Sequence, residues 1–199
     1  MAYNALAESI ALIESRQVQR VERLSRRRRF AAMSVDVAED LAVTSFARRG
    51  VGCTWHDTHV LARRQGQWVL LGGSGGTGDG DRELLADRPQ MLREWSPAVD
   101  APGLVPACGR SLLVSGSAGG VRESGDSGTG RWPWSGRWVS HTAVRASAAV
   151  ESLVVAGRML PVPWHGRVVV VWTGRRGPRV VAHDGSGQQI DNVLLTRSN

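Results

Sequence analysis

The chain has 199 residues, a formal net charge of +7 and 25 basic residues, all of which are arginine. A chain of this length forms one ordinary domain, or one domain with a smaller unit beside it. The lack of lysine excludes P-loop phosphate binding and Schiff-base or pyridoxal-phosphate chemistry, because each of these needs a lysine amine. We therefore expect no cofactor.

The N-terminal segment does not have the pattern of a signal peptide. No basic residue precedes its first apolar stretch, and Glu8 and Glu14 interrupt that stretch. The longest apolar run elsewhere, residues 168–172, is far below the ~20 residues that a membrane-spanning helix needs. Cys53 and Cys108 are too few for a secreted disulfide scaffold, so we expect reduced thiols and a cytoplasmic protein. The lysine-free composition indicates GC-rich, bacterial coding.

The first predicted element is an amphipathic helix within a unit of residues 1–34. Its apolar residues recur at spacings that keep them on one face at about 100° per residue. This face either pairs with a helix of a partner chain or covers the protein's own hairpin. The unit ends in a run of arginines, which either complement the helix dipole or contact anionic phosphates. The apolar face consists of Leu6, Ile10, Ile13, Val21 and Leu24, and the run of Arg26, Arg27, Arg28 and Arg29.

Residues 35–100 form the second predicted unit, a short helix followed by a β-hairpin. The helix is expected within residues 35–48, with Ser34 as its N-cap and Gly50 at its end. Strands at residues 51–63 and 68–71 flank a turn at Gly66, which supplies the positive φ that the turn needs. A glycine-rich loop at residues 72–80 then leads to a short helix around residues 82–87.

The third predicted unit, residues 101–199, is all β. Seven short strands separated by turn signals indicate a sandwich or small barrel. A long loop of residues 116–136, rich in Gly and Ser, is expected to be exposed. The predicted fold class is thus α+β, with N-terminal helices and a β-hairpin followed by an all-β, sandwich-like C-terminal half. The strands are expected at residues 111–115, 138–145, 150–155, 159–162, 168–172, 180–182 and 190–195.

Two short motifs are similar to catalytic or cofactor signatures. Gly125-Asp126-Ser127-Gly128 resembles the tetrapeptide around the nucleophile of chymotrypsin-like serine proteases. The resemblance covers those four residues alone, and the upstream histidine element of that family is missing. Residues 73–78 match the G-x-G-x-x-G pattern, but no parallel strand follows to complete a dinucleotide-binding unit. We therefore expect neither a protease nor a dinucleotide site.

Cys53, His56 and His59 are residue types that bind zinc. They fall in a predicted strand, where residues three apart point to opposite faces. His56 and His59 therefore diverge, and Cys53 and His59 are too far apart along the strand to share one ion. We expect no metal site here, and no catalytic residues.

Aromatic and basic residues alternate after the long loop. Trp132 and Trp134 lie close to Arg131 and Arg137. Tryptophan beside arginine is typical of protein interfaces and of surfaces that stack on nucleobases. The alternative is that these tryptophans enter the core of the sandwich.

These spacings do not bring any set of catalytic residues together. The leading expectation is therefore a non-enzymatic, intracellular binding or scaffold protein. Its contacts would involve the apolar helix face, Trp132 and Trp134, with a protein partner or a second copy of the chain. The alternative is a binder of nucleic acid or another anionic surface through Arg26, Arg27, Arg28, Arg29, Arg131 and Arg137. An enzyme is the third possibility, since catalytic groups can converge from distant positions.

Overall fold

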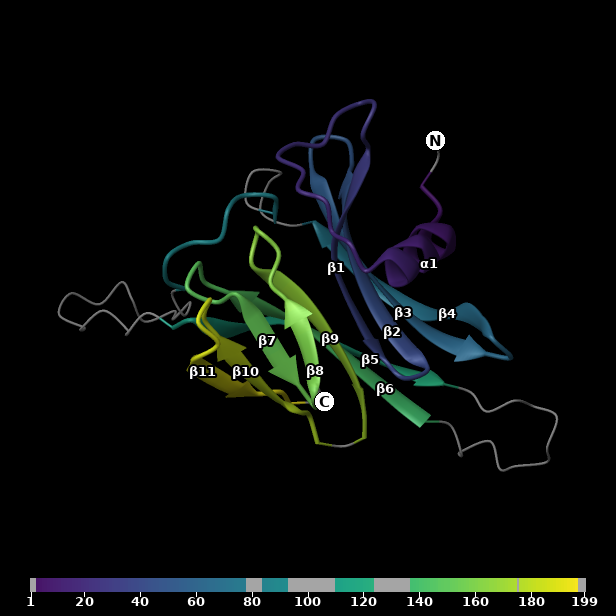
Figure 1. The fold of residues 1–199 in the computed structure, drawn as a ribbon. Helices are drawn as coiled ribbons and strands as arrows, with labels where there is room; N and C mark the ends of the chain where they lie inside the picture. The colour runs from purple at the N-terminus through teal and green to yellow at the C-terminus, as the bar shows by residue number, and fades with distance from the viewer. Residues whose placement is uncertain (1–2, 78–83, 93–109, 124–136, 175, 197–199) are drawn as a thin grey trace, which may run out of the picture.

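The computed structural model describes residues 3–77, 84–92, 110–123, 137–174 and 176–196 (Figure 1). Over these described residues the protein is mostly β, and its named helix is a short one at the N-terminus, α1 (Ala5–Ser15). The all-β half is therefore confirmed in outline, whereas the expectation of several N-terminal helices is wrong. The strands are β1 (Phe30–Ala38), β2 (Leu41–Arg49), β3 (Thr54–Arg64), β4 (Gln67–Thr77), β5 (Leu112–Glu123), β6 (Arg137–Ala146), β7 (Ser152–Val155), β8 (Arg158–Pro161), β9 (Arg167–Thr173), β10 (Arg179–His183) and β11 (Gln189–Leu194).

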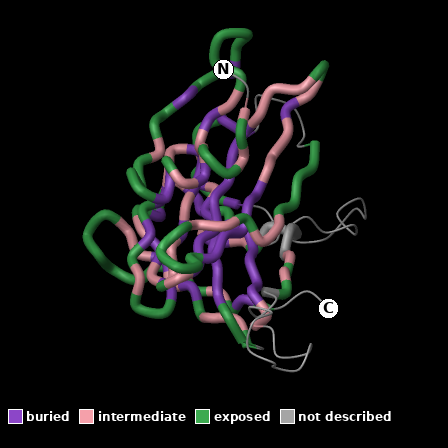
Figure 2. Tube along the Cα trace, turned by 90° about the vertical axis from the view of Figure 1, so that its right-hand side faces the viewer, coloured by how far each residue is buried: buried purple, intermediate pink, exposed green. Residues whose placement is uncertain are grey.

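The strands of the described residues form three antiparallel sheets. The N-terminal sheet has the order β1-β2-β3-β4, the middle sheet β5-β6-β9, and the C-terminal sheet β11-β10-β7-β8. Successive residues of β9 face opposite sides of the middle sheet: Val169 and Val171 pack on the N-terminal sheet, and Val168 and Val170 on the C-terminal sheet. The middle sheet is thus buried on both faces, and the two halves of the chain share one core. Figure 2 shows this buried centre with exposed turns around it.

The helix α1 covers the outer face of the N-terminal sheet (Figure 1). The side chain of Asn4 accepts a hydrogen bond from the backbone N–H of Ala7 and begins the helix. Ile13 packs on Ala42 and Leu61 of the sheet. The helix ends at Ser15 because Arg16 adopts a left-handed conformation, with φ 51°. The predicted continuation to Leu24 is therefore wrong.

Residues 35–48 are not a helix but most of the hairpin β1–β2, which also crosses the expected boundary between residues 34 and 35. The turn between the two strands contains Glu39 with φ 57°. In β2 the seven residues from Leu41 onward are all buried, because α1 covers one face and the middle sheet the other. Such burial removes the alternation that identifies a strand, and a short apolar run then reads equally well as a helix.

The hairpin predicted around Gly66 is present as β3–β4, and the glycine-rich segment after it is strand rather than loop as far as Thr77. Gly73 lies so close to β3 that a side-chain carbon there would be 2.6 Å from the carbonyl oxygen of Thr58. The glycines of β4 thus permit close strand packing instead of a phosphate-binding loop. Gly78 and residues 82–83 lie outside the described residues. Of residues 84–87, which complete the short helix expected here, Leu84 alone is helical, so the described part of that helix is not formed.

The predicted loop of residues 116–136 is also strand at its start. β5 continues to Glu123, and Gly119 and Gly120 pair with His141 and Ser140 of β6. The ring of His141 covers Gly119, so a strand poor in side chains is shielded by its neighbour. Residues 124–136, which include the protease-like tetrapeptide, lie outside the described residues.

Polar side chains of β1 cover the free edge of β9. The hydroxyl of Ser34 accepts a hydrogen bond of 3.0 Å from the backbone N–H of Val169, and the carboxylate of Asp36 accepts one of 2.9 Å from Val171. Arg158 of β8 donates two hydrogen bonds to Asp36 and one to the carbonyl of Val171. An edge strand needs such protection when no further strand pairs with it. Asp36 therefore joins all three sheets.

The turn before β9 contains a glycine, Gly166, that we expect not to tolerate a side chain. Gly166 has φ +69°, and a side-chain carbon there would overlap the carbonyl oxygen of Ala146. We expect Gly166→Ala to lower the free energy of unfolding by roughly 2–4 kcal/mol, from backbone strain plus overpacking. Gly157→Ala is the matched control, because Gly157 has φ +78° and open space around it; strain alone should cost it about 1 kcal/mol. Equal losses for the two variants in urea denaturation would contradict the prediction.

Candidate functional site

A groove lies between the edge strands β1 and β8. Its volume is about 530 Å³, which is within the usual range for binding sites of ~300–1,000 Å³. The segment that follows α1 forms one wall, and β1 and the β8–β9 connection form the others. Its described lining residues are Arg16, Val18, Arg20, Ser34, Val35, Val37, Arg158, Met159, Leu160, Pro161, Val162, Pro163 and Trp164.

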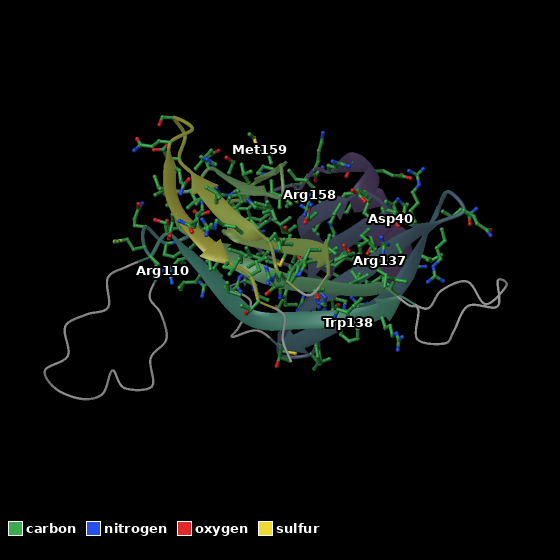
Figure 3. The ribbon with its side chains drawn as sticks, turned by 90° about the horizontal axis from the view of Figure 1, so that it is seen from below. Asp40, Arg110, Arg137, Trp138, Arg158 and Met159 are labelled. Atoms are coloured by element: carbon green, nitrogen blue, oxygen red, sulfur yellow. The ribbon has the colours of Figure 1, made fainter. Side chains whose placement is uncertain are left out.

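The sequence around β8 explains the shape of this wall. Ala156 and Gly157, with φ 46° and 78°, form a two-residue turn that pairs β8 tightly with β7. Alternation along β8 then turns Leu160 into the core and Met159 outward, where Met159 is 72% exposed (Figure 3). Pro161 ends the strand. A flexible, polarizable methionine on an open edge adapts to varied apolar ligands.

The charged side chains among the described lining residues of the groove are all arginines. Arg158 is paired with Asp36, and Arg20 lies 2.8 Å from Asp87 in an exposed ion pair. Arg16 is exposed at the end of α1 and forms no ion pair within the described ranges. No aspartate or glutamate is among the described residues that line the groove. The groove thus combines apolar walls with an unneutralised guanidinium.

The far end of the groove is held rigidly. Trp164 donates a hydrogen bond from Nε1 to the carbonyl of Leu85, and Nε2 of His165 lies 3.0 Å from the carbonyl oxygen of Met33. The backbone N–H of Arg167 donates to Nδ1 of His165, which leaves Nε2 as the protonated nitrogen that donates to Met33. Burial lowers the pKa of His165 to about 4. His165 is therefore neutral, and its hydrogen bonds hold the local structure; it does not act as an acid or base for a ligand.

A second polar cluster lies beneath α1. The hydroxyl of Ser9 is 3.0 Å from Nδ1 of His59 and 2.8 Å from the hydroxyl of Thr44, and the hydroxyl of Tyr3 is 3.4 Å from Nε2 of His59. A serine beside a histidine is the core of a nucleophilic site. Ser9, however, has no exposed surface, and burial lowers the pKa of His59 and raises that of Tyr3. The cluster attaches α1 to the sheet through side chains that are closed off from solvent at Ser9.

The residues of the predicted apolar helix face do not lie on one helix in the structure, because α1 ends at Ser15. Ile13, Val21 and Leu24 are buried in the protein's own core, so they cover the chain itself in this conformation. Ile10 is half-buried, and Leu6 is 37% exposed. Val21 and Leu24 belong to the extended segment after α1 and pack on β1, not on the helix face.

The other predicted binding residues are separated. Arg137 forms two hydrogen bonds with the carboxylate of Asp40, which lowers the pKa of Asp40 (Figure 3). The run from Arg26 to Arg29 is exposed and precedes β1, distant in sequence from the end of α1. Arg131, Trp132 and Trp134 lie outside the described residues.

The possible zinc ligands also stay apart. His59 faces α1, whereas His56 is on the opposite face of β3, with a pKa lowered to about 4, chiefly by burial. Within the described part of the chain, no three His, Cys, Asp or Glu side chains are grouped so that they could hold a metal ion. Cys53 is a free thiol.

Sequence reasoning did not find the groove. Val35 and Val37 were expected on a helix, and the strand that carries Met159 and Leu160 was expected without its position at a sheet edge. That position depends on pairings between distant segments, for which a single sequence carries no signal.

Comparisons with known protein families, with curated proteins and with solved structures find no match. Among the described residues, no helix has the length and apolar character to cross a bilayer. The geometry of the chain itself is therefore the basis for the functional proposal.

Proposed function

We propose that this protein is a non-enzymatic binding protein that holds an extended, apolar and acidic segment of a partner protein in the groove between β1 and β8. The observation that carries the proposal is an apolar groove whose described lining residues include arginines, among them the unpaired Arg16, and no aspartate or glutamate. A partner segment with aliphatic side chains and a carboxylate matches both properties.

The edge of β8 favours an extended peptide. The two-residue turn makes Val155 and Arg158 a hydrogen-bonded pair, so the next pair, Val154 and Met159, is a non-hydrogen-bonded one. The backbone N–H and C=O of Met159 consequently point away from β7, toward the open edge. Pro161 has no N–H to donate, which limits added pairing to a short stretch. Side-chain contacts with Val35, Val37 and the exposed Met159 would supply most of the affinity.

Arg16 supplies the charge complementarity. An exposed ion pair contributes little stability by itself, about 0.2–1 kcal/mol. A guanidinium at the rim of an apolar groove instead steers an acidic partner and selects against a basic one. Arg16→Glu should therefore slow association and reduce its dependence on salt.

The test uses fluorescently labelled synthetic peptides and anisotropy. One peptide alternates Val and Leu with Asp, a second replaces Asp with Arg, and a third replaces Val and Leu with Ser. We expect the first alone to bind, and Met159→Glu to weaken its binding by about tenfold or more through lost contact and charge repulsion. Met91→Glu is the matched control, since Met91 is 60% exposed but does not line the groove. No binding of the first peptide, or equal binding to both variants, would refute the proposal.

A further inference from the structure

Four consecutive arginines, Arg26 to Arg29, form an exposed turn that the groove does not use; we name them the arginine turn. Because α1 ends at Ser15, the helix dipole cannot account for this run, since that effect is confined to the last turn of a helix. In Figure 1 the segment between α1 and β1 lies at the same end of the N-terminal sheet as the β2–β3 connection.

The arginine turn is an ordered element. The backbone N–H of Ser25 donates to the carbonyl of Arg28, and the N–H of Arg28 donates to the hydroxyl of Ser25. The backbone N–H of Arg49 donates to the carbonyl of Arg29, which ties the turn to the end of β2 and makes Arg49 a backbone neighbour of the turn. Backbone contacts thus hold the chain while its side chains remain exposed.

The charges of the arginine turn have no counter-charge in an ion pair within the part of the chain that the structure describes. None of its four residues forms an ion pair with a described residue, and Arg28 contacts only the side-chain oxygen of Gln19, at 3.4 Å. A hollow of about 420 Å³ beside the turn is lined by Arg27, Arg28 and Arg29 with Gln17, and Glu8 is its one acidic lining residue. Adjacent like charges raise the energy of the folded chain, and an anionic ligand would relieve this.

We infer that the arginine turn, with Arg49, is a binding site for the phosphate backbone of a nucleic acid. Guanidinium groups pair with phosphate through two parallel hydrogen bonds, and closely spaced guanidiniums match a polymer of regularly spaced phosphates. An anionic membrane fits less well, because stable membrane attachment also needs apolar insertion. Val51 is the one large apolar side chain that the described β2–β3 connection exposes. Contacts between arginine and the phosphate backbone do not depend on the base sequence.

Salt titration tests this inference directly. Binding of a labelled DNA duplex should weaken steeply between about 50 and 200 mM salt, because each neutralised phosphate contributes about −0.9 to the slope of log K against log salt. Replacing both Arg26 and Arg27 with Gln should reduce the magnitude of that slope by about 2. The matched control replaces Arg63 and Arg64 with Gln, an equal change of charge at exposed positions at the opposite end of the sheet.

The outcomes separate the possibilities. A reduced slope for Arg26/Arg27 and an unchanged slope for Arg63/Arg64 supports the site. Equal reductions would mean that net charge alone attracts DNA, and the inference would fail. Binding to phosphatidylserine vesicles without binding to DNA would also overturn it. Met159→Glu should leave DNA binding unchanged, so the outcome does not depend on the groove.

Discussion

Replacing Asp36 with alanine is expected to lower the free energy of unfolding by about 3–5 kcal/mol, the usual consequence of breaking a buried ion pair. The side chain of Asp36 is fully buried, and that of Arg158 is 25% exposed. Without the carboxylate, Arg158 loses its counter-charge and the backbone N–H of Val171 loses its acceptor at the edge of β9. Urea denaturation followed by tryptophan fluorescence measures the loss.

Two further variants test whether the lost stability comes from breaking the buried ion pair between Asp36 and Arg158. Asp87→Ala breaks an ion pair whose side chains are 56% and 65% exposed, and we expect it to cost less than about 1 kcal/mol. Combining Asp36→Ala with Arg158→Met removes both charges and should recover part of the stability. If Asp36→Ala were as mild as Asp87→Ala, Asp36 would not be the link between the three sheets.

The stability of the protein should fall as the pH decreases from about 6.5 to about 4. The ordinary pKa of histidine is 6.5, whereas burial lowers the pKa of His165 to about 4, and Arg167, His56 and Arg88 act in the same direction. Between these two values the unfolded chain binds a proton at this position and the folded chain does not. Protonation therefore favours unfolding, and the effect levels off below the folded pKa. The shift corresponds to about 3 kcal/mol.

His165→Gln separates this residue from the other titrating groups. A glutamine amide can still donate a hydrogen bond to the carbonyl of Met33, but it cannot take up a proton. We expect this variant to be less stable than the native protein at pH 7 and to lose less stability on acidification, as measured by urea midpoints at several pH values. An unchanged pH dependence in the variant would show that His165 is not the source; His56, whose pKa is also lowered to about 4, would then be the next residue to test.

The sequence predicted the C-terminal strands closely and the N-terminal half poorly, for a physical reason. β9 contains an unbroken run of valines, and β6 contains Trp138, Val139, Thr142 and Val144, residue types that favour strand. β1 and β2 were mistaken for a helix because burial on both faces removed the alternation from β2. The apolar residues of α1 were found, but Arg16 gives no sequence signal for a left-handed helix end. The arginine turn was evident from sequence, although only the structure separates it from the helix.

The groove could not be predicted in the same way. Its walls come from segments that are widely separated in the sequence, and its openness results from two strands lying at sheet edges. Edge position is a property of topology rather than of local composition. Met159 was expected in a strand, but nothing in its neighbours shows that the strand has a partner on one side only.

The covered edge of β9 also bears on how the protein is made. β9 contains Val168, Val169, Val170, Val171 and Trp172 in unbroken succession. Uncharged runs of strong strand formers can template pairing between molecules and lead to aggregation when they are exposed. Synthesis proceeds from the N-terminus, so Ser34 and Asp36 leave the ribosome well before β9 does. The nascent chain thus already carries the groups that shield its most aggregation-prone segment when that segment emerges.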